Sequence, residues 1–284
     1  MSDAPIVVSA PGSTANLGPG FDVLGLAVGL RAEVGLGPQP GNAHMVDEHH
    51  PGVIAYRRAG GTATALWSRS RVPMGRGLGY SGSVRAAGAM LAVVEAHGPD
   101  AASDPDHRVH VTSIASTLEG HPDNAAASVH GGLVIASPSG SVTPVPVTVD
   151  VALLVWIPET TTSTDQSRTT LGTSVDRRDA VANIAAVANL IVGCTTGDLE
   201  ALRAGCHDRL HQPTRLEAVP ASRDALTNLL ELGALGAWLS GSGPTVAAFV
   251  RRDEAERIGA SLSGGRVSVI EIDTIGVTAH VGIV

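Results

Sequence analysis

The stretch that decides the fold reads Pro73-Met-Gly-Arg-Gly-Leu-Gly-Tyr-Ser-Gly-Ser83. Three alternating glycines, Gly75, Gly77 and Gly79, precede apolar residues that recur at helical spacing from Val84 to Val94. The pattern predicts a glycine-rich loop whose end is the first turn of a helix. Glycine allows close backbone approach and a helix start offers unpaired N–H groups, so this arrangement suits a bound phosphate. A plain capping turn has the same local pattern, and both interpretations stay open at this point.

The chain contains no lysine, and all 19 of its basic Lys and Arg positions are arginine. A Walker-type loop uses a lysine on the β- and γ-phosphates, so that mechanism is excluded. Protein-kinase chemistry and Schiff-base chemistry are excluded for the same reason. A nucleotide bound here must be held by backbone amides, arginine and a metal ion.

Composition limits the class of protein further. The 284 residues are 43% apolar and carry a formal net charge of −8, which suits one large or two modest domains and disfavours nucleic acid as a partner. No apolar run approaches the ~20 residues of a membrane span, and the N-terminus has no signal-peptide pattern. Cys194 and Cys206 fit neither a disulfide framework nor a zinc motif. We expect buried thiols and a reducing, cytoplasmic setting.

The first half of the chain is expected to alternate strands, loops and helices. The pattern predicts a short strand at 6–9, a turn-rich loop at 12–22, a strand at 23–36 and a helix at 52–70. The segment His44–His50 holds several metal-ligand types at no defined zinc spacing, so a solvated loop is favoured over a bound metal. A further helix is expected to end at Gly120, and a strand at 131–136.

The second half is predicted to begin after a boundary at 137–146, where serine, glycine and proline cluster. A buried strand at 149–157 comes first, then a threonine-rich loop at 160–170 and helices at 176–193 and 199–210. From Ser222 the expected order is helix, strand, strand, helix, strand, and the two central strands are joined by the glycine-rich turn Ser240–Pro244. Together with the strand near Val151, this order favours a ferredoxin-like α+β domain.

A dense polar cluster, Glu119-Gly-His-Pro-Asp-Asn124, follows the predicted helix end at Gly120. By itself it is compatible with a satisfied capping turn. Beside a phosphate loop, Glu119 becomes a candidate Mg²⁺ ligand, because that ion prefers one or two carboxylates together with phosphate oxygens.

Three glycine-bearing stretches together resemble the GHMP kinase superfamily. Pro11–Gly25 resembles its first motif, Pro73–Ser83 its second, nucleotide-phosphate motif, and Leu239–Thr245 its third, in the superfamily's order. Within it, Asn16–Asp22, Glu119–Asn124 and Asp208-Arg-Leu-His-Gln-Pro213 are similar to segments of the homoserine kinases. The resemblance implies an α+β fold of two domains, a ribosomal-protein-S5-like nucleotide-binding domain at 1–145 and a ferredoxin-like domain at 146–284.

The resemblance also implies a reaction, transfer of the γ-phosphoryl group of ATP to the side-chain hydroxyl of L-homoserine, with Mg²⁺ as the cofactor and a homodimer as the assembly. It implies Glu119, Ser81 and Arg215 as catalytic residues, with Ser81 and Glu119 as the metal ligands. It assigns substrate binding to Asn16, Asp22, His121, Thr164, Arg168 and Arg215. It assigns ATP binding to Pro73, Met74, Gly75, Arg76, Gly77, Leu78, Gly79, Tyr80, Ser81, Gly82 and Ser83. No residue stands out as a general base, and loose phosphoryl transfer does not require one.

One departure is Tyr80, which stands where the superfamily commonly has a small hydroxylic residue. Three placements are open for its ring: outward, stacked on the nucleotide, or narrowing the site. Two further functions are kept beside homoserine phosphorylation. One is a kinase for another small hydroxy acid, such as pantoate or shikimate. The other is a metabolite-binding relative that lost turnover through Tyr80.

Overall fold

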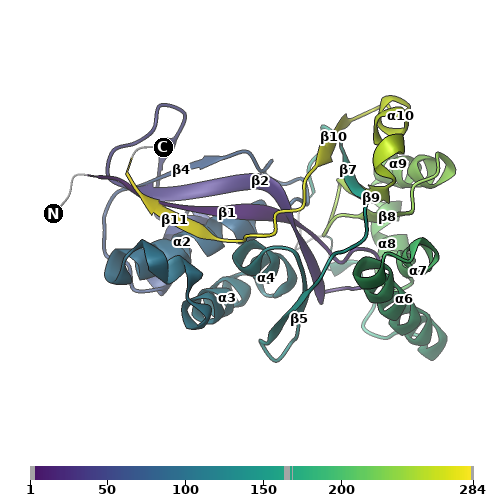
Figure 1. The fold of residues 1–284 in the computed structure, drawn as a ribbon, viewed down its shortest axis with the longest axis horizontal. Helices are drawn as coiled ribbons and strands as arrows, with labels where there is room; N and C mark the ends of the chain where they lie inside the picture. The colour runs from purple at the N-terminus through teal and green to yellow at the C-terminus, as the bar shows by residue number, and fades with distance from the viewer. Residues whose placement is uncertain (1–3, 163–166, 168, 283–284) are drawn as a thin grey trace.

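The computed structural model describes residues 4–162, 167 and 169–282. Within these residues seven strands form the first sheet and four form the second, and all named strand pairs are antiparallel. Figure 1 shows the two sheets side by side along the long axis of the molecule. This arrangement confirms the predicted α+β class.

The first sheet has the order β11-β1-β2-β4-β3, and β5 joins it by pairing with both β2 and β6. Its strands are β1 Ile6–Ala15, β2 Leu24–Leu36, β3 His44–Val46, β4 Leu66–Ser70, β5 Leu133–Ala136, β6 Val142–Val145 and β11 Thr278–Val281. Its helices are α1 Pro51–Arg58, α2 Tyr80–His97, the short 3₁₀ helix η1 Pro99–Ser103, α3 Pro105–Glu119 and α4 Asp123–His130. Figure 1 shows α2, α3 and α4 along one face of the sheet.

The second sheet has the order β10-β7-β9-β8. Its strands are β7 Ala152–Ile157, β8 Gly236–Leu239, β9 Val246–Val250 and β10 Arg266–Ile270. The helices of this half are α6 Arg177–Thr196, α7 Leu199–Gly205, α8 Gln212–Glu217, α9 Pro220–Glu231, the 3₁₀ helix η2 Arg252–Glu254 and α10 Ala255–Ala260. The order of strands and helices is the predicted ferredoxin-like one.

Strand β7 is apolar throughout because both of its faces are covered. Leu153 and Val155 belong to the large core that also contains α2 and the first sheet. Leu154 and Trp156, which point the other way, pack in a second core with residues of α9 and α10. A strand buried on both faces reads as a continuous apolar run instead of an alternating one.

The division at residue 145 stays a proposal. The strands of the second sheet all follow that position, but the last strand, Thr278–Val281, returns to pair with β1. The predicted boundary segment 137–146 is not an extended linker, because Val142–Val145 pairs with Leu133–Ala136 as a hairpin.

Three other expectations were wrong in detail. Strand β1 does not end before Pro11: it continues to Ala15 across an irregularity between Pro11 and Gly12, because the long β2 pairs with it on both sides of that point. The segment 52–70 holds α1 and then β4, not a single helix. His44–Val46 is not loop but strand β3, which pairs with β4.

Candidate active site

The glycine loop before α2 has the predicted geometry. Gly75, Gly77 and Gly79 have φ values of 67, 71 and 70°, and Gly79 is the N-cap of the 18-residue helix. A residue with a side chain adopts this left-handed region only at a cost in energy. The loop therefore presents its backbone, instead of side chains, in front of the helix N-terminus.

Close approach of other segments explains why two of these positions are glycine. A Cβ at Gly77 would lie 2.4 Å from the carbonyl oxygen of Ser240, and a Cβ at Gly79 would lie 2.1 Å from Oγ of Ser13. Ser13 belongs to β1 and Ser240 to the turn after β8, so the loop is held between segments of both halves. The Ser240 hydroxyl also donates to the carbonyl of Gly77 (2.6 Å).

The segment after β1 is held in an unusual backbone conformation beside this loop. Asn16, Leu17 and Asp22 have φ values of 70, 47 and 57°, which non-glycine residues rarely adopt. Nδ2 of Asn16 donates to the carbonyl of Gly241 (3.1 Å), and its Oδ1 accepts from the backbone N–H of Asp22 (3.1 Å). Asn16 thus ties the first-half segment to the turn between β8 and β9.

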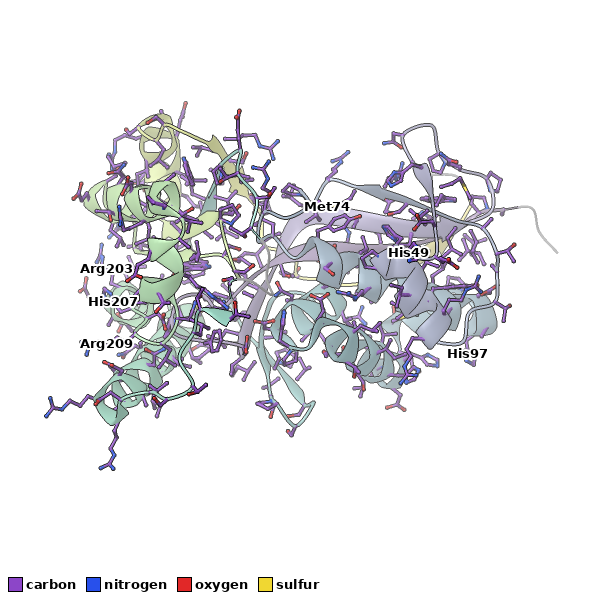
Figure 2. The ribbon with its side chains drawn as sticks, turned by 180° about the vertical axis from the view of Figure 1, so that it is seen from behind. His49, Met74, His97, Arg203, His207 and Arg209 are labelled. Carbon is purple, nitrogen blue, oxygen red and sulfur yellow. The ribbon has the colours of Figure 1, made fainter. Side chains whose placement is uncertain are left out.

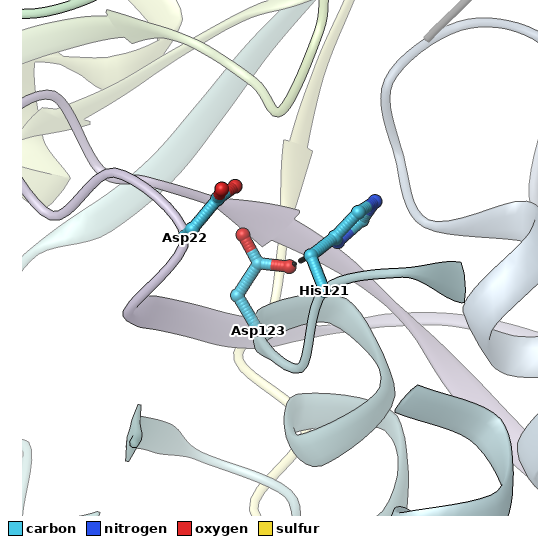
Figure 3. Close-up of side chains that lie close together, drawn as sticks. All are labelled: Asp22, His121 and Asp123. Atoms are coloured by element: carbon cyan, nitrogen blue, oxygen red, sulfur yellow. Dashed lines mark hydrogen bonds and ion pairs between the residues drawn. The ribbon is translucent and has the colours of Figure 1, made fainter. Parts of the chain in front are cut away.

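Two carboxylates and an imidazole meet at the start of α4. Ligand atoms of Asp22, His121 and Asp123 all lie within 4.8 Å of one another (Figure 3). Asp123 is 2% exposed, and its Oδ1 pairs with Nδ1 of His121 (2.8 Å) and accepts from the backbone N–H of Asn124 (2.7 Å). The carboxylate of Asp123 thereby fixes the imidazole ring, and the carboxylate of Asp22 lies close to both groups (Figure 3).

A buried arginine comes from α8 in the second half. Arg215 is 4% exposed, its Nη1 donates to the carbonyl of Gly241 (3.1 Å), and its guanidinium lies 5.2 Å from the ring centre of Phe21. Burial lowers the pKa of His211, which favours the neutral ring. Its partners fit that form, because Nε2 lies 2.9 Å from the carbonyl of Gly18 and Nδ1 lies 3.3 Å from Nη1 of Arg215.

These groups surround one cavity of about 350 Å³. Of the predicted site residues, it is lined by Asn16, Asp22, Pro73, Met74, Gly75, Arg76, Gly77, Gly79, Tyr80, Ser81, Glu119, His121 and Arg215. Met74, labelled in Figure 2, is 66% exposed. Leu78 and Ser83 are buried and, with Gly82, do not line the cavity. The expectations for Thr164 and Arg168 lie outside the described residues.

The sequence did not reveal every residue that lines the cavity. His50 and Pro51 come from the segment that matches the superfamily least, and Thr162 comes from the loop after β7. Nε2 of His50 lies 3.2 Å from the hydroxyl of Tyr80, and its Nδ1 accepts from the backbone N–H of Gly52 (3.2 Å). Tyr80 therefore forms part of the cavity wall and does not point outward. Its contact with His50, 30 positions away, and its packing against the large core set this orientation.

The two predicted metal ligands converge on a single atom. Nη1 of Arg85 donates to Oγ of Ser81 and forms an ion pair with Oε1 of Glu119. A hydroxyl and a carboxylate directed at one point are donors that suit a hard divalent cation, with phosphate oxygens and water completing its shell. The residues thus fit Mg²⁺, although a guanidinium occupies the point where they meet.

The fold and this cavity define a small-molecule kinase of the GHMP type. The model of the GHMP kinases N-terminal domain matches residues 50–132, and that of their C-terminal domain matches residues 184–265. The chain belongs to the homoserine kinase family. It is 36% identical to the homoserine kinase of Thermus thermophilus over 270 residues, which is 90% of each chain. It is 37% identical to that of Moorella thermoacetica over 270 residues, covering 86% of this chain and 87% of the other.

Solved structures agree on the fold. A homoserine kinase from Cytophaga hutchinsonii matches with a TM-score of 0.83 at 24% identity, covering 99% of this chain and 98% of the other. The mevalonate kinase of Methanococcus jannaschii matches with a TM-score of 0.67 at 10% identity, covering 94% and 98%. These likenesses confirm the predicted GHMP kinase fold.

Proposed function

We propose that this enzyme transfers the γ-phosphoryl group of ATP to the side-chain hydroxyl of L-homoserine, forming O-phospho-L-homoserine. One observation carries the proposal: a single cavity is lined by the glycine loop and by side chains of opposite charge. Asp22 and Asp123 offer carboxylates to the ammonium group of an amino acid. Arg215 offers its guanidinium to the carboxylate. Family membership supports the same substrate.

The parts of the cavity receive separate roles in this proposal. Backbone amides between Gly75 and Ser83 hold the phosphates, together with the N-terminus of α2. His50, Pro51 and Tyr80 form the nucleoside end. Asn16, Asp22, His121 and Arg215 hold the amino acid, and Thr164 and Arg168 join them on the strength of the family resemblance alone.

Catalysis is proposed to need no obligatory general base. Phosphoryl transfer passes through a loose transition state, so positioning and charge stabilisation supply most of the rate. Asp123, at the start of α4, holds the ring of His121 by a hydrogen bond. A ring fixed in this way suits binding and orientation of the substrate. Arg215 fixes the carboxylate end so that the hydroxyl reaches the γ-phosphate.

Mg²⁺ is the proposed cofactor, with Ser81 and Glu119 as its protein ligands. When bound, the ion neutralises charge on the β- and γ-phosphates. The protein's own contribution is to direct a hydroxyl from the first turn of α2 and a carboxylate from the end of α3 at one point. Glu119 is well placed for this task because its side chain is only 8% exposed.

The substrate is tested by release of ADP in the presence of homoserine, pantoate or shikimate. We expect turnover with homoserine to exceed that with either hydroxy acid, because only homoserine carries an ammonium group for Asp22 and Asp123. Preference for pantoate or shikimate would favour the second candidate within the superfamily. Binding of homoserine without turnover of any substrate would favour the metabolite-binding relative.

We also propose that the enzyme is a homodimer that assembles through the exposed face of α6. Val181, Ile184 and Val192 are 59%, 70% and 45% exposed, and Ala185 and Ala188 lie between them on the same face. Contiguous exposed apolar surface of this kind marks an interaction site. Small residues at its middle would allow two helices to approach closely.

Charge supports a second copy as the occupant of this face. An antiparallel pair of α6 helices crossing near Ala188 would bring Arg177 and Arg178 of one copy toward Asp198 and Glu200 of the other. All four residues are exposed. The same arrangement places the positive N-terminus of each helix beside the negative C-terminus of the other.

Replacement of Ile184 by aspartate is expected to turn the dimer into a monomer, because the interface would then bury two like charges in place of two apolar side chains. Light scattering coupled to gel filtration measures the mass directly. The matched control is Val109→Asp, which changes another exposed apolar side chain, on α3 (59% exposed), and should leave the dimer intact. A monomeric wild-type chain, or a dimeric Ile184→Asp variant, would contradict the proposed interface.

A cytoplasmic location is proposed on two grounds. Cys194 and Cys206 are free and buried, as expected for a reducing compartment, and ATP is the phosphoryl donor. Among the described residues, α6 is the one helix that is long and apolar enough to cross a membrane by length and composition. Of its apolar 18-residue stretch, 28% is buried inside the protein. The proposed dimer gives that apolar face a partner without a membrane.

A further inference from the structure

Arg85 lies one helical turn after Ser81 on α2 and is mostly buried. Its side chain is 19% exposed, and the carboxylate that it faces, on Glu119, is 8% exposed. The same nitrogen, Nη1, meets both Ser81 and Glu119. This guanidinium is therefore the positive charge that neutralises the buried carboxylate at the phosphate end of the cavity.

The ion pair is not built like a permanent structural one. Strong arginine–carboxylate pairs use two parallel hydrogen bonds. Here Nε of Arg85 is buried without a hydrogen-bond partner among the described residues, and Oε1 of Glu119 meets the guanidinium without hydrogen-bond alignment. Arg85 thus offers one nitrogen to two oxygens, which is how a single cation would be held.

The two described arginines that line the cavity, Arg76 and Arg215, are engaged elsewhere. Nη1 of Arg76 donates to the carbonyl of Pro158, and Nη1 of Arg215 donates to the carbonyl of Gly241. Since the chain has no lysine, Arg85 is the cation on the first turns of the helix that follows the glycine loop.

We propose that Arg85 is a built-in competitor for the divalent cation at Ser81 and Glu119. In the empty enzyme its guanidinium holds both ligands, and a metal–nucleotide complex binds only when Arg85 gives up Glu119. The proposal rests on the metal ligands assigned under the proposed function. It adds that metal affinity is set by a residue outside the ligand set, because two cations at one carboxylate repel each other.

The test measures binding of Mn²⁺, a paramagnetic substitute for Mg²⁺, by electron paramagnetic resonance and by the rise in Tm during a metal titration. Arg85→Gln keeps hydrogen-bonding capacity but removes the charge. We expect it to bind Mn²⁺ about tenfold more tightly than the wild type, and its Tm to rise more steeply with added metal. Arg85→Lys keeps a cation and should bind Mn²⁺ as weakly as the wild type.

The matched control is Arg69→Gln, which removes the cation of another partly buried ion pair. Arg69 and Glu33 have side chains that are 23% and 19% exposed and lie on β4 and β2, outside the cavity. This variant should lose stability without any gain in Mn²⁺ affinity. The double variant Arg85→Gln/Glu119→Gln removes both charges of this pair, so it should fold even if Arg85→Gln does not, and it should bind no Mn²⁺.

Equal or weaker Mn²⁺ binding by Arg85→Gln would overturn the proposal, as would retained metal binding in the double variant. Failure here is distinguishable from failure of the proposed function. If the wild-type enzyme phosphorylates homoserine but Arg85→Gln binds Mn²⁺ no more tightly than the wild type, only the competitor role is removed. Tighter binding by Arg85→Gln in an enzyme that does not phosphorylate homoserine would leave the competitor role and remove the function.

Discussion

Replacement of Arg215 by glutamine is expected to lower kcat/KM for homoserine by about 10²–10³-fold, most of it through a higher KM. A buried guanidinium that forms two charge-assisted hydrogen bonds to a carboxylate contributes about 3–4 kcal/mol. Glutamine cannot supply either the charge or the fork of two N–H groups. The measurement is steady-state ADP release over a range of homoserine concentrations.

Two controls separate substrate binding from folding. Arg209→Gln removes a guanidinium whose side chain is 62% exposed in the loop before α8, and it should leave KM unchanged. The affinity of Arg215→Gln for ATP should also stay close to that of the wild type, because Arg215 is assigned to the amino-acid end. An unchanged homoserine KM in a folded Arg215→Gln variant would remove this residue from the substrate site.

Replacement of Gly77 by alanine is expected to lower the free energy of unfolding by about 2–5 kcal/mol and to weaken ATP binding as well. Part of the loss comes from the positive φ of 71°, which costs alanine about 1–2 kcal/mol. The rest comes from the new Cβ, which would lie 2.4 Å from the backbone oxygen of Ser240 and 2.7 Å from that of Gly243. Denaturant unfolding and nucleotide titration measure the two effects.

Gly60→Ala provides the matched control for Gly77→Ala. Gly60 also has a positive φ, 96°, but a Cβ there would meet nothing within 4 Å. This variant should therefore show only the conformational cost of about 1–2 kcal/mol and bind ATP normally. Equal losses of stability in the two variants would mean that contact between the glycine loop and the turn after β8 does not constrain Gly77.

Local patterns predicted much of this fold because the signals were strong. Alternating glycines before a helical stripe marked the loop and α2, and Gly120 marked the end of α3. The apolar run around Val155 marked a strand buried on both faces. In each case neighbouring residues determine the conformation, so the sequence alone carried the information.

Other features depend on residues distant in the chain and were missed. Strand β1 continues past Pro11 because β2 supplies partners there, and Thr278–Val281 joins the first sheet only after the chain has returned from the second half. Helix α4 begins at Asp123, inside a cluster that was interpreted as a capping turn or as a set of polar ligands, and not as the start of a helix. Helix α4 has only eight residues, so its apolar periodicity is too short to predict it.

The candidate site was predictable in its glycine loop and its charged ends, since motif order supplied them. The tertiary contacts inside it were not. Nothing in local spacing places His50 against Tyr80, or Asn16 against the carbonyl of Gly241. Arg85 lies on a helix whose other residues from Gly82 to Val94 are buried, and the packing of α2 beside α3 directs it to Glu119.

The central claim is that one cavity, lined by main-chain amides and by oppositely charged side chains, aligns ATP with an amino acid. A crystal structure with homoserine and a non-hydrolysable ATP analogue tests it most directly. The account predicts the triphosphate against Gly75–Ser83, the ammonium group near Asp22 and the carboxylate on Arg215. Nucleotide bound away from the glycine loop, or homoserine bound with no contact to Arg215, would contradict it.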